Sequence, residues 1–107
     1  MGPLAGVKII ELAGIGPCPM AAMLLAELGA DVLKVDRLMP SGLGITVPDE
    51  HALLNRSRRS LAVDLKHADG VALVLRLCGQ ADALIEGFRP GVTERLGLGP
   101  GDCTARN

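Results

Sequence analysis

Length, composition and charge exclude several classes of protein at the outset. With 107 residues, of which 49% are hydrophobic, the chain has room for one modest folded domain and is unlike a disordered segment. Its single aromatic residue, Phe88, argues against base stacking on single-stranded nucleic acid, and its net charge of −1 gives no overall field to attract DNA or anionic lipid.

The first third of the chain has the pattern of a strand, a helix and a second strand. Residues 7–12 (VKIIEL) form a short apolar, β-branched run that predicts a buried strand. Residues 19–29 predict a helix with proline in its first turn and Gly29 at its end, and 30–36 predict the next strand. Such a unit has parallel strands joined by a right-handed crossover.

The rest of the chain repeats this alternation after a long loop, predicted at 38–56. A strand is expected at 59–65, an amphipathic helix at 67–80 and a strand at 81–88, followed by a turn with a short helix and by the start of another helix from residue 100. The fold class is therefore α/β, with a Rossmann-like parallel sheet flanked by helices. Ligands of such folds bind at the carboxyl ends of the strands, here 11–19, 36–37, 64–67 and 87–91.

The first strand end carries a glycine-containing turn, Gly14 to Pro19. It lacks the third glycine of a dinucleotide fingerprint, and its two prolines remove backbone donors that a pyrophosphate would use. We therefore expect no nicotinamide or flavin cofactor. Cys18 begins the helix, where the dipole would lower the pKa of its thiol, but with no histidine beside it a small buried residue is the favoured interpretation.

Basic residues follow the other strand ends. Arg37 and Lys66 come after separate strands and could converge on one phosphate-bearing ligand, and Arg89 sits on a Pro-Gly turn. A further cluster, Arg56, Arg58 and Arg59, would reach the site only by folding over it. The alternative for each of these residues is a solvated surface charge.

The three cysteines are widely spaced and the two histidines are not near them in sequence, which predicts no metal site and no disulfide framework. No apolar run approaches the length of a membrane span, and no signal-peptide pattern is present. We expect a cytoplasmic protein with reduced thiols and no membrane or nucleic-acid partner.

Two long strings carry a family resemblance: GVKIIELAGIGPCPMAAMLLAELGADVLKVDR and RSLAVDLKHADGVALVLRLCGQADALIEGFRPGVTERLGLGP. Together they resemble the N-terminal part of family III CoA-transferases, and within that family the α-methylacyl-CoA racemase branch. The resemblance covers residues 3–107, and only 38–55 departs noticeably from it.

The resemblance implies a CoA-binding, Rossmann-like large domain, an interlocked homodimer and an acyl-CoA thioester as substrate, with no separate cofactor. The CoA-binding residues that it implies are Arg37, Val63, Asp64, Leu65, Lys66 and Arg89. The turn at Ile15, Gly16 and Pro17 would border the active-site entrance, with Cys18 in place of the glycine usual in the family.

The resemblance also implies that the catalytic His and Asp of the family lie beyond Asn107. Residues 1–107 are then expected to be a partial domain, an N-terminal fragment of a 2-methylacyl-CoA epimerase that is inactive alone, since α-proton exchange needs two positioned acid–base groups. The alternatives are a fragment of a CoA-transferase of the same family, a small non-catalytic CoA- or nucleotide-binding module, or a truncated chain without a ligand. Acyl specificity stays open.

Overall fold

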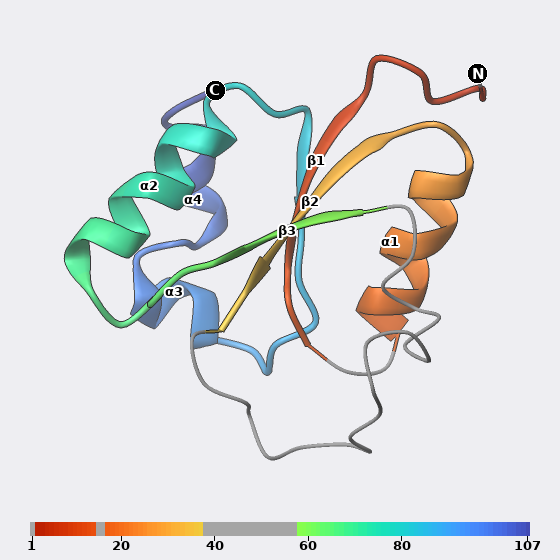
Figure 1. The fold of residues 1–107 in the computed structure, drawn as a ribbon. Helices are drawn as coiled ribbons and strands as arrows, with labels where there is room; N and C mark the ends of the chain where they lie inside the picture. Colours follow the sequence, from red (N-terminus) through yellow and green to blue (C-terminus); the bar gives the residue numbers. More distant parts are fainter. Residues whose placement is uncertain (1, 15–16, 38–57) are drawn as a thin grey trace.

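A computed structural model describes residues 2–14, 17–37 and 58–107 of the chain (Figure 1). The helices and strands alternate in the predicted order. Their bounds are β1 Lys8–Leu12, α1 Pro17–Glu27, β2 Asp31–Asp36, β3 Arg59–Ala62, α2 Ala68–Cys78, β4 Ala83–Ile85, α3 Val92–Leu96 and α4 Pro100–Thr104. The predicted loop at 38–56 lies outside the described residues.

The strands form one 4-stranded parallel sheet in the order β3-β2-β1-β4. Helix α1 connects β1 to β2, and α2 carries the chain from β3 at one edge to β4 at the other. The direction of winding reverses between β1 and β4, and in open α/β sheets this reversal marks the crevice where ligands bind. The predicted fold class is confirmed.

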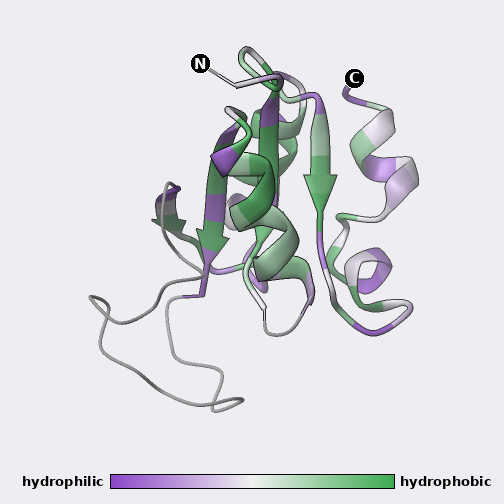
Figure 2. Ribbon diagram, turned by 90° about the vertical axis from the view of Figure 1, so that its right-hand side faces the viewer, coloured by the Kyte–Doolittle hydropathy of each residue, from purple (hydrophilic) through white to green (hydrophobic). Residues whose placement is uncertain are grey.

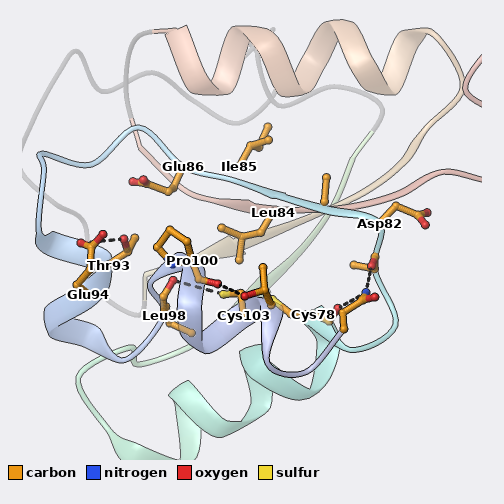
Figure 3. Close-up of a pocket in the computed structure, with 14 residues that line it drawn as sticks. Cys78, Asp82, Leu84, Ile85, Glu86, Thr93, Glu94, Leu98, Pro100 and Cys103 are labelled. Carbon is orange, nitrogen blue, oxygen red and sulfur yellow. Dashed lines mark hydrogen bonds between the residues drawn. The ribbon is translucent and has the colours of Figure 1, made fainter.

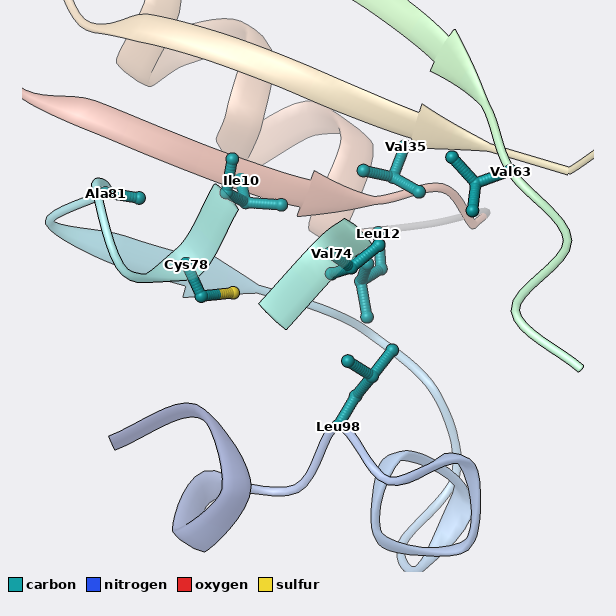
Figure 4. Packing of buried hydrophobic residues seen from close by; sticks show 8 residues of the cluster. All are labelled: Ile10, Leu12, Val35, Val63, Val74, Cys78, Ala81 and Leu98. Atoms are coloured by element: carbon teal, nitrogen blue, oxygen red, sulfur yellow. The ribbon is translucent and has the colours of Figure 1, made fainter. Parts of the chain in front are cut away.

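Each face of the sheet carries its own cluster of buried apolar side chains. Helix α1 covers one face through the buried cluster Ile9, Ala22, Ala30 and Val32. The helices α2, α3 and α4 lie against the other face, where the larger cluster comprises Ile10, Leu12, Val35, Val63, Val74, Cys78, Ala81 and Leu98 (Figure 4). Figure 2 shows that hydrophobic residues concentrate along the strands between these layers.

Two strands are shorter than predicted, for identifiable reasons. At the start of the predicted strand 81–88, the N–H of Ala81 donates to the carbonyl of Cys78 and so still belongs to the end of α2. At its end, the carboxylate of Glu86 accepts the N–H of Phe88 (2.7 Å) and turns the chain. The strand predicted at 59–65 ends at Ala62, although the N–H of Val63 still reaches the carbonyl of Asp36 (2.9 Å).

The edge strand β3 is tied to the sheet by a buried ion pair. All of its residues are exposed, so apolar packing of the strand itself does little to hold it. Just before it, Arg58 reaches across β2 to Glu11 of β1, with 2.7 Å between Nε and Oε1. The two side chains are 1% and 0% exposed, and neither makes a further hydrogen bond among the described residues.

Burial dominates the electrostatics of this pair. Loss of solvent raises the pKa of Glu11, while the positive charges of Arg58 and Lys34 oppose that rise without cancelling it. The pair is therefore a poor source of net stability, because its desolvation outweighs its attraction.

We predict that Arg58→Met alone destabilises the protein, by about 3 kcal/mol at neutral pH, because it leaves Glu11 buried without its nearest counter-charge. Replacing both residues by apolar ones, Glu11→Leu with Arg58→Met, is expected to be neutral or stabilising. Urea denaturation of the two variants measures the difference. A double variant less stable than the single one would contradict this account. The exposed pair Arg59–Asp31 supplies the control, since Asp31→Asn should cost less than about 1 kcal/mol.

The raised pKa of Glu11 also predicts a pH dependence. The native state holds this proton more tightly than the unfolded chain, so the stabilisation from Glu11 is complete below its ordinary pKa of 4.5 and is lost as pH rises through the higher, folded-state pKa. The free energy of unfolding of the wild type should therefore fall relative to that of Glu11→Gln above pH 4.5. Denaturation of both proteins across this range tests the sign, and a constant or rising difference would refute it.

Candidate functional site

The segments that follow β1 and β4 pack closely against each other. A Cβ added to Gly87, just beyond β4, would lie 3.1 Å from the Cβ of Cys18 in the first turn of α1. Cys18 is buried, and burial together with the nearby carboxylates of Glu11 and Glu86 raises the pKa of its thiol. The idea that the helix dipole lowers this pKa is wrong, and the interpretation as a small buried residue is confirmed. Of the predicted entrance residues, Pro17 is the exposed first residue of α1, whereas Ile15 and Gly16 lie outside the described residues.

The turn after β3 is held by a local hydrogen-bond network. The Oδ1 atom of Asp64 accepts the N–H of Lys66 (3.0 Å), and the Asp64 carbonyl accepts the N–H of His67 (3.2 Å). His67 then caps α2, its Nδ1 accepting the N–H of Asp69 (3.1 Å). The exposed Lys66 side chain thus projects from a turn whose backbone is fixed on both sides.

This turn opens onto a groove that follows α2 and has a volume of about 620 Å³. Lys66 and His67 lie at the amino end of the helix. Arg95 comes from α3, and Arg106 lies near the other end of α2, where its carbonyl would be 3.4 Å from a Cβ on Gly79. The remaining lining is apolar: Leu65, Ala68, Val71, Ala72, Leu75 and Leu96. The groove therefore combines a basic rim with an apolar floor, and its described lining contains no carboxylate.

A larger cavity of about 720 Å³ lies between β4 and the helices α3 and α4 (Figure 3). Its charged lining residues are Asp82, Glu86 and Glu94, with no lysine or arginine among the described ones. Although it has the greater volume, this cavity would repel a phosphorylated ligand, and the groove along α2 would attract one.

The structure brings together some of the residues predicted to bind CoA and separates others. Leu65 and Lys66 line the groove, whereas the side chain of Val63 is 6% exposed and belongs to the core. Arg37, directly after β2, and Arg89, beyond β4, are exposed beyond strands that β1 separates, and they line neither cavity.

The cluster of three arginines, which would reach the site only by folding over it, does not do so where it is described. Arg58 is buried against Glu11, and the guanidinium of Arg59 binds Asp31 at the beginning of β2 (2.9 Å). Both interactions lie away from the turn after β3. Arg56 lies outside the described residues.

Sequence reasoning missed Arg95 and Arg106, which complete the basic rim. Their segments were predicted only as short helices, and no local pattern showed that these helices pack beside α2. The available signal was the amphipathic pattern of α2. Val71 and Leu75 are partly exposed on one side of this helix, where another segment could pack beside them.

None of the helices in the described part of the chain has the length and apolar character that crossing a membrane requires. The same residues contain no group of three or more side chains placed to hold a metal ion.

Comparison with known proteins gives a consistent result. The sequence profile of CoA-transferase family III matches residues 4–107. Alpha-methylacyl-CoA racemase of Mus musculus is 46% identical over 97 residues, which are 91% of this chain and 23% of the racemase. The alpha subunit of succinyl-CoA–L-malate CoA-transferase from Chloroflexus aurantiacus is 37% identical over 105 residues, 90% of this chain and 24% of the subunit.

Solved structures agree with these relatives. Rv3272 from Mycobacterium tuberculosis has a TM-score of 0.86 at 35% identity, covering 100% of this chain and 31% of that protein. A CAIB/BAIF family protein from Brucella suis has a TM-score of 0.85 at 36% identity, covering 99% of this chain and 31% of that protein. The chain thus spans about a quarter to a third of the length of the proteins it matches.

We predict that the turn after β3 is sensitive to a single methyl group on α2. A Cβ at Gly70 would lie 2.1 Å from the carbonyl oxygen of Asp64, so Gly70→Ala must displace the turn and should cost roughly 1–3 kcal/mol or more. Gly101 in α4 is the matched control, because nothing lies within 4 Å of its added Cβ. Gly101→Ala should be neutral or slightly stabilising. Thermal denaturation of both variants compares them, and equal midpoints would contradict the close approach.

Proposed function

The chain belongs to CoA-transferase family III, and we propose that it binds the CoA portion of an acyl-CoA thioester along α2. The observation that carries this proposal is the groove with its basic rim and apolar floor. CoA combines phosphate groups with a largely apolar pantetheine arm, so it needs cations and an apolar surface close together. The groove offers both.

The cations differ in what they contribute. Arg95 and Arg106 present planar guanidinium groups that suit two-point contact with phosphate oxygens, while Lys66 adds a compact point charge. Because the turn that carries Lys66 is fixed by Asp64 and by the start of α2, little ordering is needed when a ligand binds.

The order of the strands suggests the path of the ligand beyond the groove. Along the carboxyl edge of the sheet, Lys66 follows β3, Arg37 follows β2 and Pro17 follows β1. An extended ligand that leaves the groove toward the crevice between β1 and β4 would pass Arg37, and Arg89 would meet it from the far side. We assign the thioester end of the substrate to this crevice.

For the reaction itself, we favour epimerisation of a 2-methylacyl-CoA by exchange of the α-proton, with the acid–base groups outside this chain and a homodimer as the active form. Transfer of CoA to a carboxylate acceptor is the alternative, supported by the transferase among the relatives. In the full-length protein, uptake of deuterium at the α-carbon in D2O supports the first reaction. Transfer of CoA between carboxylates without such uptake supports the second.

The binding proposal predicts that Lys66→Gln and Arg95→Gln each weaken CoA binding in the full-length protein about tenfold, the effect of losing roughly one charge-assisted hydrogen bond. Calorimetric titration with CoA at fixed ionic strength measures this loss. Arg76→Gln is the matched control, because Arg76 is an exposed arginine on α2 that does not line the groove. Affinities that fall equally in all three variants would point to a general charge effect and reject the groove.

A matched pair of arginine variants tests the proposed path of the ligand past the end of β2. Arg37→Gln should weaken CoA binding, whereas Arg59→Gln, which removes an exposed cation already bound to Asp31, should leave the affinity unchanged. An Arg37→Gln variant that binds CoA like the wild type would reject the path past Arg37 and leave the groove as the only contact.

A further inference from the structure

The larger cavity, which the proposed function leaves unused, carries two thiols in its wall. Cys78 is the last residue of α2 and Cys103 lies in α4, so they come from different helices of the same layer (Figure 3). Cys78 is 6% exposed and belongs to the core, while Cys103 is half-buried and packs against that core.

The two side chains share one cavity wall and one apolar cluster. The side chain of Cys103 packs against the buried cluster that contains Cys78, and its Sγ atom donates a hydrogen bond to the carbonyl oxygen of Leu98 (3.4 Å). Burial and the neighbouring thiol raise the pKa of Cys78 to about 11. The half-buried Cys103 is therefore the thiol that an oxidant from solvent meets first.

The backbone around the pair is already held together. The Nδ2 atom of Asn107, just after α4, donates to the carbonyl oxygens of Cys78 (3.2 Å) and Ala81 (2.6 Å). This clamp fixes the end of α2 against the segment that follows Cys103. A covalent bond between the thiols would therefore join two segments that the fold already places side by side.

We propose that Cys78 and Cys103 form a reversible disulfide when the protein meets a hydroperoxide. Cys103 loses its proton and its thiolate attacks the peroxide, forming an S–O bond as the O–O bond breaks. The leaving oxygen takes up that proton and departs as water or an alcohol. The Cys78 sulfur then attacks the resulting sulfenic acid, the S–O bond breaks, and a second water carries away the oxygen and the Cys78 proton. Two thiols are oxidised and one peroxide is reduced.

The disulfide would close the chain from Cys78 to Cys103 into a loop that contains β4 and α3. Such a link restricts the unfolded chain and should raise the thermal midpoint of the oxidised protein by roughly 5 °C or more. It would also fix α3, which carries Arg95, relative to α2.

The test uses the full-length protein, treated with hydrogen peroxide, alkylated and then digested with trypsin. Cleavage after Arg76, Arg95 and Arg106 places the two thiols in separate peptides, 77–95 and 96–106. We expect these peptides to appear as one linked species, lighter than their sum by two hydrogens, that dithiothreitol separates. The reduced protein should regain its lower thermal midpoint.

The third cysteine provides the matched control. Cys18 is about as buried as Cys78 but lies in the first turn of α1, so Cys18→Ser should leave the linked peptide in place, whereas Cys103→Ser and Cys78→Ser should abolish it. Cys103 is half-buried, so its serine variant keeps the test usable if Cys78→Ser fails to fold. Oxidation of Cys103 to sulfinic acid without the linked species, or full alkylation of both thiols after peroxide treatment, would overturn the proposal.

Discussion

The buried ion pair between Arg58 and Glu11 is the contact on which the position of β3 depends. The strand itself buries no residue, and a slip by one position would turn the Arg58 side chain to the opposite face of the sheet. Only one register brings the guanidinium to the carboxylate. The raised pKa of Glu11 shows that the pair costs desolvation, so we interpret its role as fixing the register of β3 more than stabilising the fold.

The geometry of one side of the groove depends on the register of β3. With β3 in this register, the side chain of Val63 lies in the core. The turn from Asp64 to His67 then packs closely against Gly70 of α2, and this contact positions Lys66 at the amino end of that helix. The other side of the groove is fixed independently of β3. Leu98, 1% exposed between α3 and α4, anchors both short helices to the sheet, and this anchoring brings Arg95 and Arg106 beside α2.

Local pattern was enough to predict the fold but not the site. The apolar runs of β1 and β2, the glycine after α1 and the amphipathic period of α2 are properties of neighbouring residues, and each correctly predicted its element. The burial of Arg58 depends on Glu11, far away in the sequence, so in a run of arginines it looked like surface charge. Cys18 was correctly predicted to be buried, but the lower pKa expected for its thiol was wrong for a related reason. The helix dipole acts locally, whereas the burial that raises this pKa depends on distant residues such as Gly87, just beyond β4. The proposed roles of Arg37, Lys66 and Arg89 came from their places after predicted strands and from the family resemblance, and they stay predictions.

The distribution of charged side chains matters more for the choice of ligand than the net charge does. The net charge of −1 gave no indication of an overall field, yet the structure places acidic side chains around one cavity and basic side chains around another. Asp82, Glu86 and Glu94 line one of them, while Lys66, Arg95 and Arg106 line the other. Recognition of a phosphate depends on the charges within contact distance and on the surface that excludes water around them, because solvent screens the rest. The apolar floor formed by Val71, Leu75 and Leu96 supplies that surface in the groove. A nearly neutral chain can therefore favour a highly anionic ligand, provided that its cations share one wall with apolar side chains.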